Sequence, residues 1–402
     1  MSDRLWTKSY VLALGVGFLL SLVFYLFMTT MALYAVERFG AGDALAGLAS
    51  SVFVVGALVS RLLAGALVDR FGQRRVLLAS LVVFAVAALA YLPAEGLGVL
   101  LAVRAVHGFA FGLAHTAASA VVQALVPASR RAEGTGYHGA STTLATALGP
   151  FAAVVVMGRH GYDGLFVAAA VASFLALGAA VWLRAGSAPA GPRRVRQRTA
   201  PIEPRALPIA SFALLGAAAY SGVIAFLNPY AASLDLTAAA AMFFLVYAAA
   251  VLITRPAIGR LQDARGDNVV MYPAIACFAA GLALLSVAQD ALVLLLAAGL
   301  LGLGWGTVMS AGQAIAVGTA PITHVGRVMS TYFLLVDLGM GLGPVLLGVL
   351  VGRSGYSWMY AALAVVVVLS AGVYHLVHGN SRARAREVAR RAVAHEPVPA
   401  AD

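Results

Sequence analysis

The residue best suited to proton chemistry in this sequence is Asp337, in the segment FLLVDLGMG. It is the only acid far from the end of an apolar run, since the others fall in loops, tails or the last turn of a run. Asp337 lies about eleven residues, or roughly 16 Å, inside its run. A poorly solvated carboxyl group at that depth is suited to take up and release a proton. The alternative is an acid that is paired to a neighbouring helix.

Arg104, in LLAVRAVHGFAFG, and His115 are the other candidates for carrying or modulating a proton. A charge buried in a bilayer costs several kcal/mol, so Arg104 must face a cavity or a partner. The alternative is an arginine that snorkels to the nearby membrane surface. Arg104, Gly108, Phe111 and His115 recur at helical spacing and would share one helical face.

The elements that position these residues must be membrane helices. The chain has 402 residues, of which 62% are hydrophobic and 11% charged, too few polar residues to cover a soluble globule. Its net charge of +11 does not indicate nucleic-acid binding, because the basic residues lie almost wholly in short gaps between apolar runs. The single cysteine, Cys277, cannot form an internal disulfide.

Apolar runs of the length that a spanning helix needs occur twelve times. The sequence therefore predicts an all-α integral membrane protein with twelve helices, the first retained rather than cleaved as a signal. The predicted spans are 10–36, 45–68, 76–94, 98–124, 136–158, 162–183, 209–232, 239–259, 269–288, 291–317, 326–351 and 355–377.

The charge pattern predicts the domains and the topology. We expect a six-helix bundle over 1–183, a cytoplasmic linker rich in Pro, Gly and Arg over 184–208, a second bundle over 209–378 and a cytoplasmic tail over 379–402. Most basic residues then lie on the side of the two termini, whereas Arg38, Arg159 and Arg353 lie on the other. Basic residues are held on the cytoplasmic side of a membrane. We therefore expect the protein in the inner (plasma) membrane of the cell, with both termini in the cytoplasm. The arginines of the tail could also form a surface helix on anionic lipid.

The two halves repeat one another at a constant offset of 194 residues. Such an offset indicates a tandem duplication of a six-helix unit. Asp337 has Thr143 as its counterpart, so the fold itself does not demand the acid. Identical pairs include Arg61 with Arg255, Gly65 with Gly259, Asp69 with Asp263, Gly72 with Gly266, and Gly149–Pro150 with Gly343–Pro344.

The segment GALVDRFGQRR, residues 65–75, resembles the loop between helices 2 and 3 of the major facilitator superfamily. Only Gln73 departs from that pattern. The resemblance implies a transporter made of two parallel six-helix repeats, with its substrate site at the midplane between them. It also implies a cytoplasmic latch that holds the halves in the outward-open state; the alternative is solvated loop charges. The residues concerned are Gly65, Asp69, Arg70, Gly72, Arg74 and Arg75. The second copy, GRLQDARGDNV, lacks the trailing bases, so we expect a weaker latch there.

Two further motifs bear on the direction of transport. Arg104 matches an arginine of helix 4 that the family's proton-coupled exporters use in coupling. Gly149 with Pro150, and Gly343 with Pro344, resemble the core of the motif of drug and metabolite antiporters, although Ala145 and Ala153 replace its usual glycines. Close packing of small residues and proline bends would explain these pairs equally well.

Family geometry also implies which residues line the central cavity, since helices 1, 4, 7 and 10 surround it. For each residue named below, the two alternatives of substrate contact and plain helix packing stay equally open. The candidates near the middle of those helices are Tyr25, Phe111, His115, Tyr220, Asn228, Trp305, Met309 and Gln313. His107 and His138 are expected to be hydrogen-bonded structural histidines.

These observations predict a secondary transporter that exports a small amphipathic molecule in exchange for protons. An importer of the same fold, for a sugar, organic acid or other metabolite, is the alternative. A membrane enzyme is disfavoured because clustered acids or metal ligands are missing, and an ATP-driven pump because the sequence has no GxxxxGK loop. We expect a monomer in the lipid bilayer that needs no cofactor or metal and binds no nucleic acid.

Overall fold

The computed structural model describes residues 4–28, 30–41, 43–183 and 202–380, and every regular element in those ranges is helical. The predicted all-α fold is therefore confirmed. Most of the predicted linker and the predicted surface helix of the tail lie outside the described residues.

The first half of the chain forms α1 (Lys8–Met28), α2 (Met31–Phe39), α3 (Asp43–Phe71), α4 (Gln73–Leu89), α5 (Leu97–Leu125), the 3-10 turn η1 (Ala128–Arg130) and α6 (Arg131–Val181). The second half forms α7 (Leu207–Ser233), α8 (Thr237–Arg265), α9 (Asp267–Ser286), α10 (Ala291–Gly318), the 3-10 turn η2 (Ile322–His324), α11 (Val325–Tyr374) and a final π turn, η3 (His375–Gly379). The predicted domain limits stay predictions, and α7 begins two residues before the limit expected at 209.

The two longest helices, α6 and α11, each contain two helices joined at a sharp bend. Gly161 (φ 64°) and Gly355 (φ 79°) interrupt them with backbone angles that favour glycine, and the two residues are repeat counterparts. Ten helical segments of the described chain are long and apolar enough to cross a membrane. The predicted count of twelve is not reproduced in full, because α4 has only 17 residues and the first part of α6 is rich in glycine and hydroxyl side chains.

The first predicted span, 10–36, is wrong in extent. Helix α1 ends at Met28 because its 21 residues already reach across a hydrocarbon core. The chain continues as the short amphipathic helix α2, on which Tyr34 is buried and Leu33 and Val36 are exposed.

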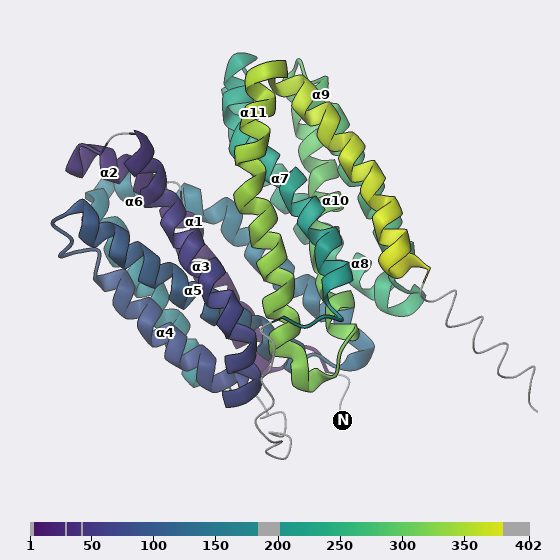
Figure 1. Cartoon of the computed structure of the whole chain (residues 1–402), viewed down its shortest axis with the longest axis horizontal. Coiled ribbons are helices and arrows are strands. Elements are labelled where there is room, and N and C mark those ends of the chain that lie inside the picture. The colour runs from purple at the N-terminus through teal and green to yellow at the C-terminus, as the bar shows by residue number, and fades with distance from the viewer. Residues whose placement is uncertain (1–3, 29, 42, 184–201, 381–402) are drawn as a thin grey trace, which may run out of the picture.

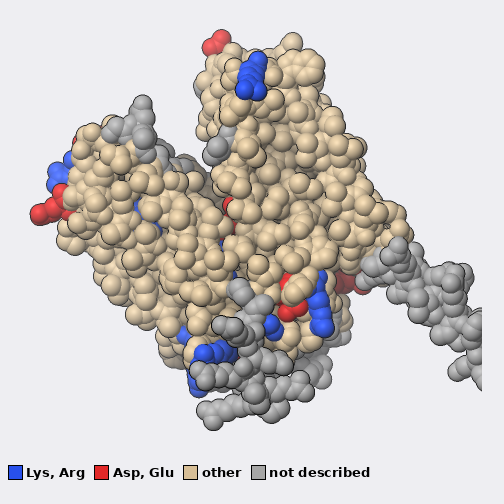
Figure 2. Space-filling model, in the orientation of Figure 1, with Lys and Arg blue, Asp and Glu red and all other residues tan. Residues whose placement is uncertain are grey.

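The helices form two bundles that lean together at one end and separate at the other (Figure 1). Within the first bundle α1 packs on α6 and α3 on α5, and within the second α7 packs on α11 and α10 on α8 and α9. We call the joined end the linker face, because residues 183 and 202 and the turns after α3 and α8 lie there. The opposite end, which carries the bends at Gly161 and Gly355, is the open face. The space-filling surface has a cleft between the bundles that widens toward the open face (Figure 2).

Glycine shapes the two equivalent turns of the linker face. Gly72 (φ 86°, ψ 141°), between α3 and α4, and Gly266 (φ 94°, ψ 168°), between α8 and α9, have angles that other residues adopt only with strain. Glycine at both positions lets these short turns form without that strain.

Replacing Gly72 by alanine should therefore destabilise the fold. We expect Gly72→Ala to cost about 1–3 kcal/mol of backbone strain and to lower the midpoint of thermal unfolding in detergent. Gly98→Ala is the matched control, because Gly98 lies in α5 with nothing near the added methyl group. Equal midpoints for the two variants would contradict this account.

Candidate functional site

The bundles contact one another along two seams on the linker-face side of the cleft. In the first seam α3 packs against α11, and in the second α6 packs against α8. The repeat offset relates these seams, since α3 and α8 are equivalent, as are the first part of α6 and the first part of α11.

In the first seam, Asp69 bridges the two bundles at the linker face. Its Oδ2 accepts a hydrogen bond from Arg327 Nε at 2.9 Å, and its Oδ1 accepts one from the backbone N–H of Gly326 at 3.0 Å. Gly65 makes this approach possible, because a methyl group there would lie 2.7 Å from the Cα of Arg327. On the far side of Arg327, Glu203 lies 3.9 Å from Nη2. Asp69 is thus a direct contact between bundles.

In the second seam, Asp263 makes the equivalent bridge. Its carboxylate accepts backbone hydrogen bonds from Ala132 at 2.9 Å and Glu133 at 3.0 Å, at the start of α6. Glu133 also forms an ion pair with Arg260 at 3.3 Å. The second copy of the motif therefore also connects the two bundles. Both of its donors are backbone N–H groups, whereas the first copy uses the backbone of Gly326 and the side chain of Arg327.

The basic end of the first motif stays within its own bundle. Arg74 donates to the carbonyls of Val181 and Leu183, both at 2.9 Å, and so caps the end of α6. Its repeat counterpart, Asn268, donates to the carbonyl of Gly379 at 2.9 Å. Both halves therefore use this position to hold their last helix.

The remaining predicted latch residues make local contacts. The Arg70 guanidinium lies 5.0 Å from the centre of the Phe71 ring, within α3. Arg75 is exposed at the start of α4. Gly72 forms the turn described above.

Deeper in the first seam, Arg61 of α3 forms an ion pair with Asp337 of α11. Arg61 Nε lies 2.5 Å from Asp337 Oδ2, and Nη1 donates to Thr116 Oγ1 on α5 at 3.3 Å. The hydroxyl of Ser330 donates to the Arg61 carbonyl. The Arg61 side chain is only 2% exposed, whereas Asp337 keeps 22% exposure. The alternative of a paired acid is thus what the geometry shows, but its partner belongs to the other bundle.

His115 and Phe333 extend this cluster across the seam. The His115 ring lies 4.7 Å from Phe333, edge to face, and 5.3 Å from Phe111, stacked. The Arg61 guanidinium lies 5.0 Å from the centre of the same Phe333 ring. His115 Nδ1 is buried without a hydrogen-bond partner among the described residues. Two of the three proton-coupling candidates, Asp337 and His115, therefore lie in one cluster around Arg61 and Phe333.

Arg104 lies apart from that cluster. It is 1% exposed, donates from Nε to the carbonyl of Ala49 at 2.7 Å, and its guanidinium lies 5.0 Å from the Phe53 ring. These contacts are inside the first bundle, so the snorkelling alternative does not hold.

In the second seam, Arg255 is the counterpart of Arg61. It donates to the Ser310 hydroxyl, and from Nη2 to the carbonyl of Gly306 at 2.6 Å, both on α10. Methyl groups on Gly136 or Gly139 of α6 would lie 3.5 and 3.3 Å from its side chain, so α6 covers it with backbone.

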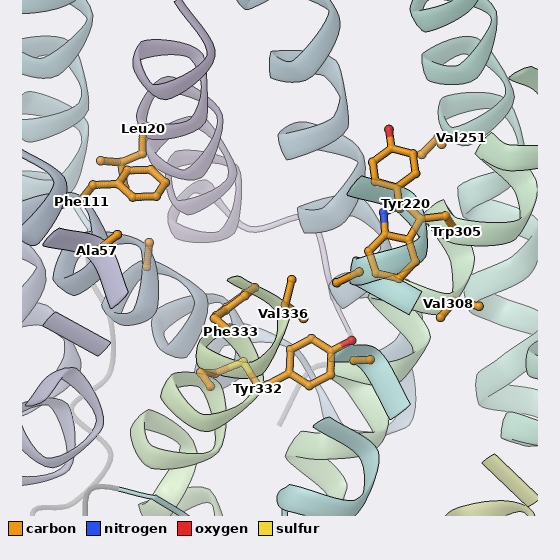
Figure 3. Packing of buried hydrophobic residues seen from close by; sticks show 14 of the residues in the cluster. Leu20, Ala57, Phe111, Tyr220, Val251, Trp305, Val308, Tyr332, Phe333 and Val336 are labelled. Atoms are coloured by element: carbon orange, nitrogen blue, oxygen red, sulfur yellow. The ribbon is translucent and has the colours of Figure 1, made fainter. Parts of the chain in front are cut away.

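Aromatic residues gather in both bundles near the cleft. In the second bundle the ring of Tyr220 stacks on Trp305 at 5.5 Å and on Tyr247 at 5.6 Å. Figure 3 shows Tyr220 and Trp305 on one side of the view and Phe111 of the first bundle on the other, with Phe333 of α11 between the two sides. Red and blue atoms along the seam mark charged groups where the cleft narrows (Figure 2).

The other predicted cavity residues are scattered. Tyr25 lies near Asp337 and Thr146, Met309 accepts a hydrogen bond from Tyr332 at its carbonyl (2.8 Å), and Gln313 is buried against Met329. Asn228 is exposed near the end of α7, ahead of Pro229.

The paired Gly-Pro segments lie at close helix contacts. A methyl group on Gly149 would lie 2.6 Å from Tyr25 Cβ on α1, and one on Gly343 would clash with the hydroxyl of Ser221 on α7. Pro150 and Pro344 sit inside helices that continue past them.

The two histidines expected to be structural are both buried and hydrogen-bonded. His107 Nδ1 lies 3.1 Å from the Tyr91 hydroxyl, and His138 Nε2 lies 3.1 Å from the Ser119 hydroxyl. In the part of the chain that the structure describes, no group of three His, Cys, Asp or Glu could hold a metal ion.

Comparisons with known proteins agree with this architecture. The sequence profile of the Major Facilitator Superfamily matches residues 13–310 and 244–400. An uncharacterized MFS-type transporter of Burkholderia mallei is 27% identical over 345 residues, 84% of this chain and 83% of that protein. Another, of Methanocaldococcus jannaschii, is 22% identical over 388 residues, covering 91% and 95%.

Two solved structures share the fold. The human organic anion transporter MFSD10 (TETRAN) superposes with a TM-score of 0.73 at 16% identity, over 91% of this chain and 98% of that one. The proton:xylose symporter XylE superposes with a TM-score of 0.71 at 13% identity, over 92% and 94%.

The buried ion pair predicts an unequal response to single and double substitution. Removing one partner of such a pair typically costs about 3–5 kcal/mol, because the other charge is left buried. We expect Arg61→Gln to lower the thermal midpoint of the purified protein strongly, and the double variant R61Q/D337N to recover most of that loss. Additive losses in the double variant would show that the two residues do not act as a pair.

The linker-face bridge predicts a shift between open and closed seams. Asp69→Asn keeps the shape of the side chain but removes its charge toward Arg327. Spin labels at Phe71→Cys and Arg265→Cys, in a Cys277→Ser background, should report longer distances across the linker face in the variant. Glu95→Gln, an exposed acid of the α4–α5 loop, is the control. Unchanged distances would favour solvated loop charges instead.

Proposed function

The chain belongs to the Major Facilitator Superfamily, a family of transporters rather than enzymes, and on that premise we propose that it exports a small amphipathic molecule in exchange for protons. It is a multi-pass membrane protein. The observation that carries the proposal is the Arg61–Asp337 pair, because it joins an ionisable acid to the contact between the two bundles.

The proposed orientation places the linker face in the cytoplasm. The basic residues of the turns after α3 and α8 support it, because positive charge is retained on the cytoplasmic side. In that orientation the structure corresponds to a state that is open to the outside, with both seams closed on the cytoplasmic side. The plasma membrane is the proposed location.

Asp337 would couple the proton to the seam. As a carboxylate it holds Arg61 across the first seam at 2.5 Å. A proton that reaches Asp337, whose side chain keeps 22% exposure, would remove the charge that Arg61 needs. Losing an interaction of about 3 kcal/mol would shift an open–closed equilibrium by roughly two orders of magnitude. The first seam would then part and open the cavity to the cytoplasm.

His115 and Arg61 would modulate this step. Both lie against Phe333, so separating α11 from α3 and α5 would expose all three residues together. Arg61 must keep hydrogen-bond acceptors once Asp337 is neutral, and Thr116 provides one. The aromatic residues Phe111, Tyr220 and Trp305 would offer flat apolar surfaces to an amphipathic substrate.

An importer that couples protons to uptake is the alternative, and the direction of proton flow separates it from an exporter. Proteoliposomes loaded with a pH-sensitive dye would be exposed to a panel of amphipathic solutes. A solute exchanged for protons makes the lumen more alkaline as it enters, whereas a solute carried with protons makes the lumen more acidic. Alkalinisation supports the proposal, and acidification overturns it in favour of symport.

Neutralising Asp337 should uncouple transport from protons. We expect Asp337→Asn to reduce solute-dependent proton flux by at least about tenfold, because its amide cannot exchange a proton at neutral pH. Glu95→Gln is the control. An undiminished flux in Asp337→Asn would remove Asp337 from the mechanism.

A further inference from the structure

The two seams differ in charge at equivalent positions. In the first, Arg61 is bonded to the Thr116 hydroxyl of α5 and paired with Asp337 across the seam. In the second, Arg255 is bonded to the Ser310 hydroxyl of α10, which the repeat offset relates to Thr116. The position equivalent to Asp337 is Thr143, whose hydroxyl donates to the carbonyl of Gly139 at 3.0 Å.

Arg255 is therefore a buried cation without a carboxylate. Its residue is 4% exposed, and no ion pair among the described residues includes it. Its two hydrogen-bond acceptors, Ser310 and the carbonyl of Gly306, are neutral, and its Nε is buried with no hydrogen-bond partner among the described residues. An arginine at membrane depth without a counter-charge is costly and marks a functional site.

The second seam also lacks side chains at the positions from which a counter-charge could approach Arg255. Gly136 and Gly139 lie against Arg255, at the positions where Ser330 and Phe333 lie against Arg61. Thr143 follows one turn later on the same face of α6. The second seam therefore omits both the ring and the acid of the first.

Stacked aromatic residues lie on the two helices that carry Arg255 and its acceptors. Gly306, whose carbonyl Arg255 holds, follows Trp305 in α10, and Trp305 stacks on Tyr220, which stacks on Tyr247 of the Arg255 helix. A guanidinium and stacked rings on the same pair of helices are complementary to a carboxylate attached to a flat apolar body.

We propose that Arg255 binds the anionic group of the substrate, and that the substrate is an organic carboxylate with a flat apolar body. Its carboxylate takes the place at Arg255 that the Asp337 carboxylate takes at Arg61, while its body stacks on Trp305 and Tyr220. The inference rests on the proposed transport function and names its substrate class. Because α6 covers Arg255 in this state, the substrate reaches it when α6 separates from α8, that is, from the linker face.

The test supplies the missing acid from the protein itself. Thr143→Asp places a carboxylate at the position equivalent to Asp337. There it should pair with Arg255 and exclude the carboxylate of the substrate. Thr143→Asn has nearly the same size without the charge and is the matched control. The probes are 2-naphthoate and its neutral amide, 2-naphthamide, titrated against the purified full-length chain with binding read by calorimetry and thermal shift.

We expect the wild type to bind 2-naphthoate at least tenfold more tightly than 2-naphthamide. Thr143→Asp and Arg255→Gln should both abolish that preference, whereas Thr143→Asn and Arg353→Gln, an exposed arginine of the open face, should keep it. Thr143→Asp should also raise the thermal midpoint above that of Thr143→Asn, since it gives Arg255 a counter-charge.

A wild type without preference for the carboxylate would overturn the proposal, as would a preference that survives in Thr143→Asp. If Arg255→Gln does not fold, Thr143→Asp still decides, because it leaves Arg255 in place. The dye-loaded proteoliposomes separate this failure from failure of the proposed function. In that assay, one outcome is that a neutral or cationic solute drives proton exchange equally well in the wild type and in Arg255→Gln. This result would support the proposed antiporter and contradict the proposed anion site at Arg255.

Discussion

The structure depends on how each charge inside the apolar bundles is balanced. An arginine among membrane helices needs acceptors for its donors and an opposite charge within reach, because no water is there to provide them. Arg61 has an acceptor in its own bundle, Thr116, but it finds its opposite charge only by reaching across to Asp337 of the other bundle. The balance of that charge therefore depends on the bundles being together, so any change that neutralises Asp337 also acts on the arrangement of the two halves.

Backbone geometry makes such contacts possible. Gly65 and Gly259 allow the ends of α3 and α8 to approach the opposite bundle closely enough for Asp69 and Asp263 to accept backbone hydrogen bonds from it. Both aspartates thus bind the first turn of a helix, where unpaired N–H groups are available and an anion is favoured. The same local pattern repeated in sequence becomes two equivalent contacts.

Much of this was predictable from local sequence. Apolar run length predicted most of the helices within a few residues, and Asp337 stood out because acids are rare at that depth. The partner of Asp337 was not identified, since 276 residues separate it from Arg61 and only folding brings them together. A signal did exist: Arg61 and Arg255 are arginines inside apolar runs at equivalent positions of both repeats. The end of α1 was missed because residues 29–36 are as apolar as a membrane helix. The contact of Arg74 with the end of α6 was missed because the carbonyls that it caps carry no sequence signature.

The asymmetry between Asp337 and Thr143 also constrains how this chain could have arisen. A symmetric dimer of two first halves would place a threonine opposite Arg61 at both seams and leave both arginines without a counter-charge. A dimer of two second halves would place Asp337 opposite Arg255 twice and make both seams ionisable. One ionisable seam beside one that is not requires two different halves, and a single chain keeps both in every molecule, so the two halves can divide between them work that identical subunits would have to share.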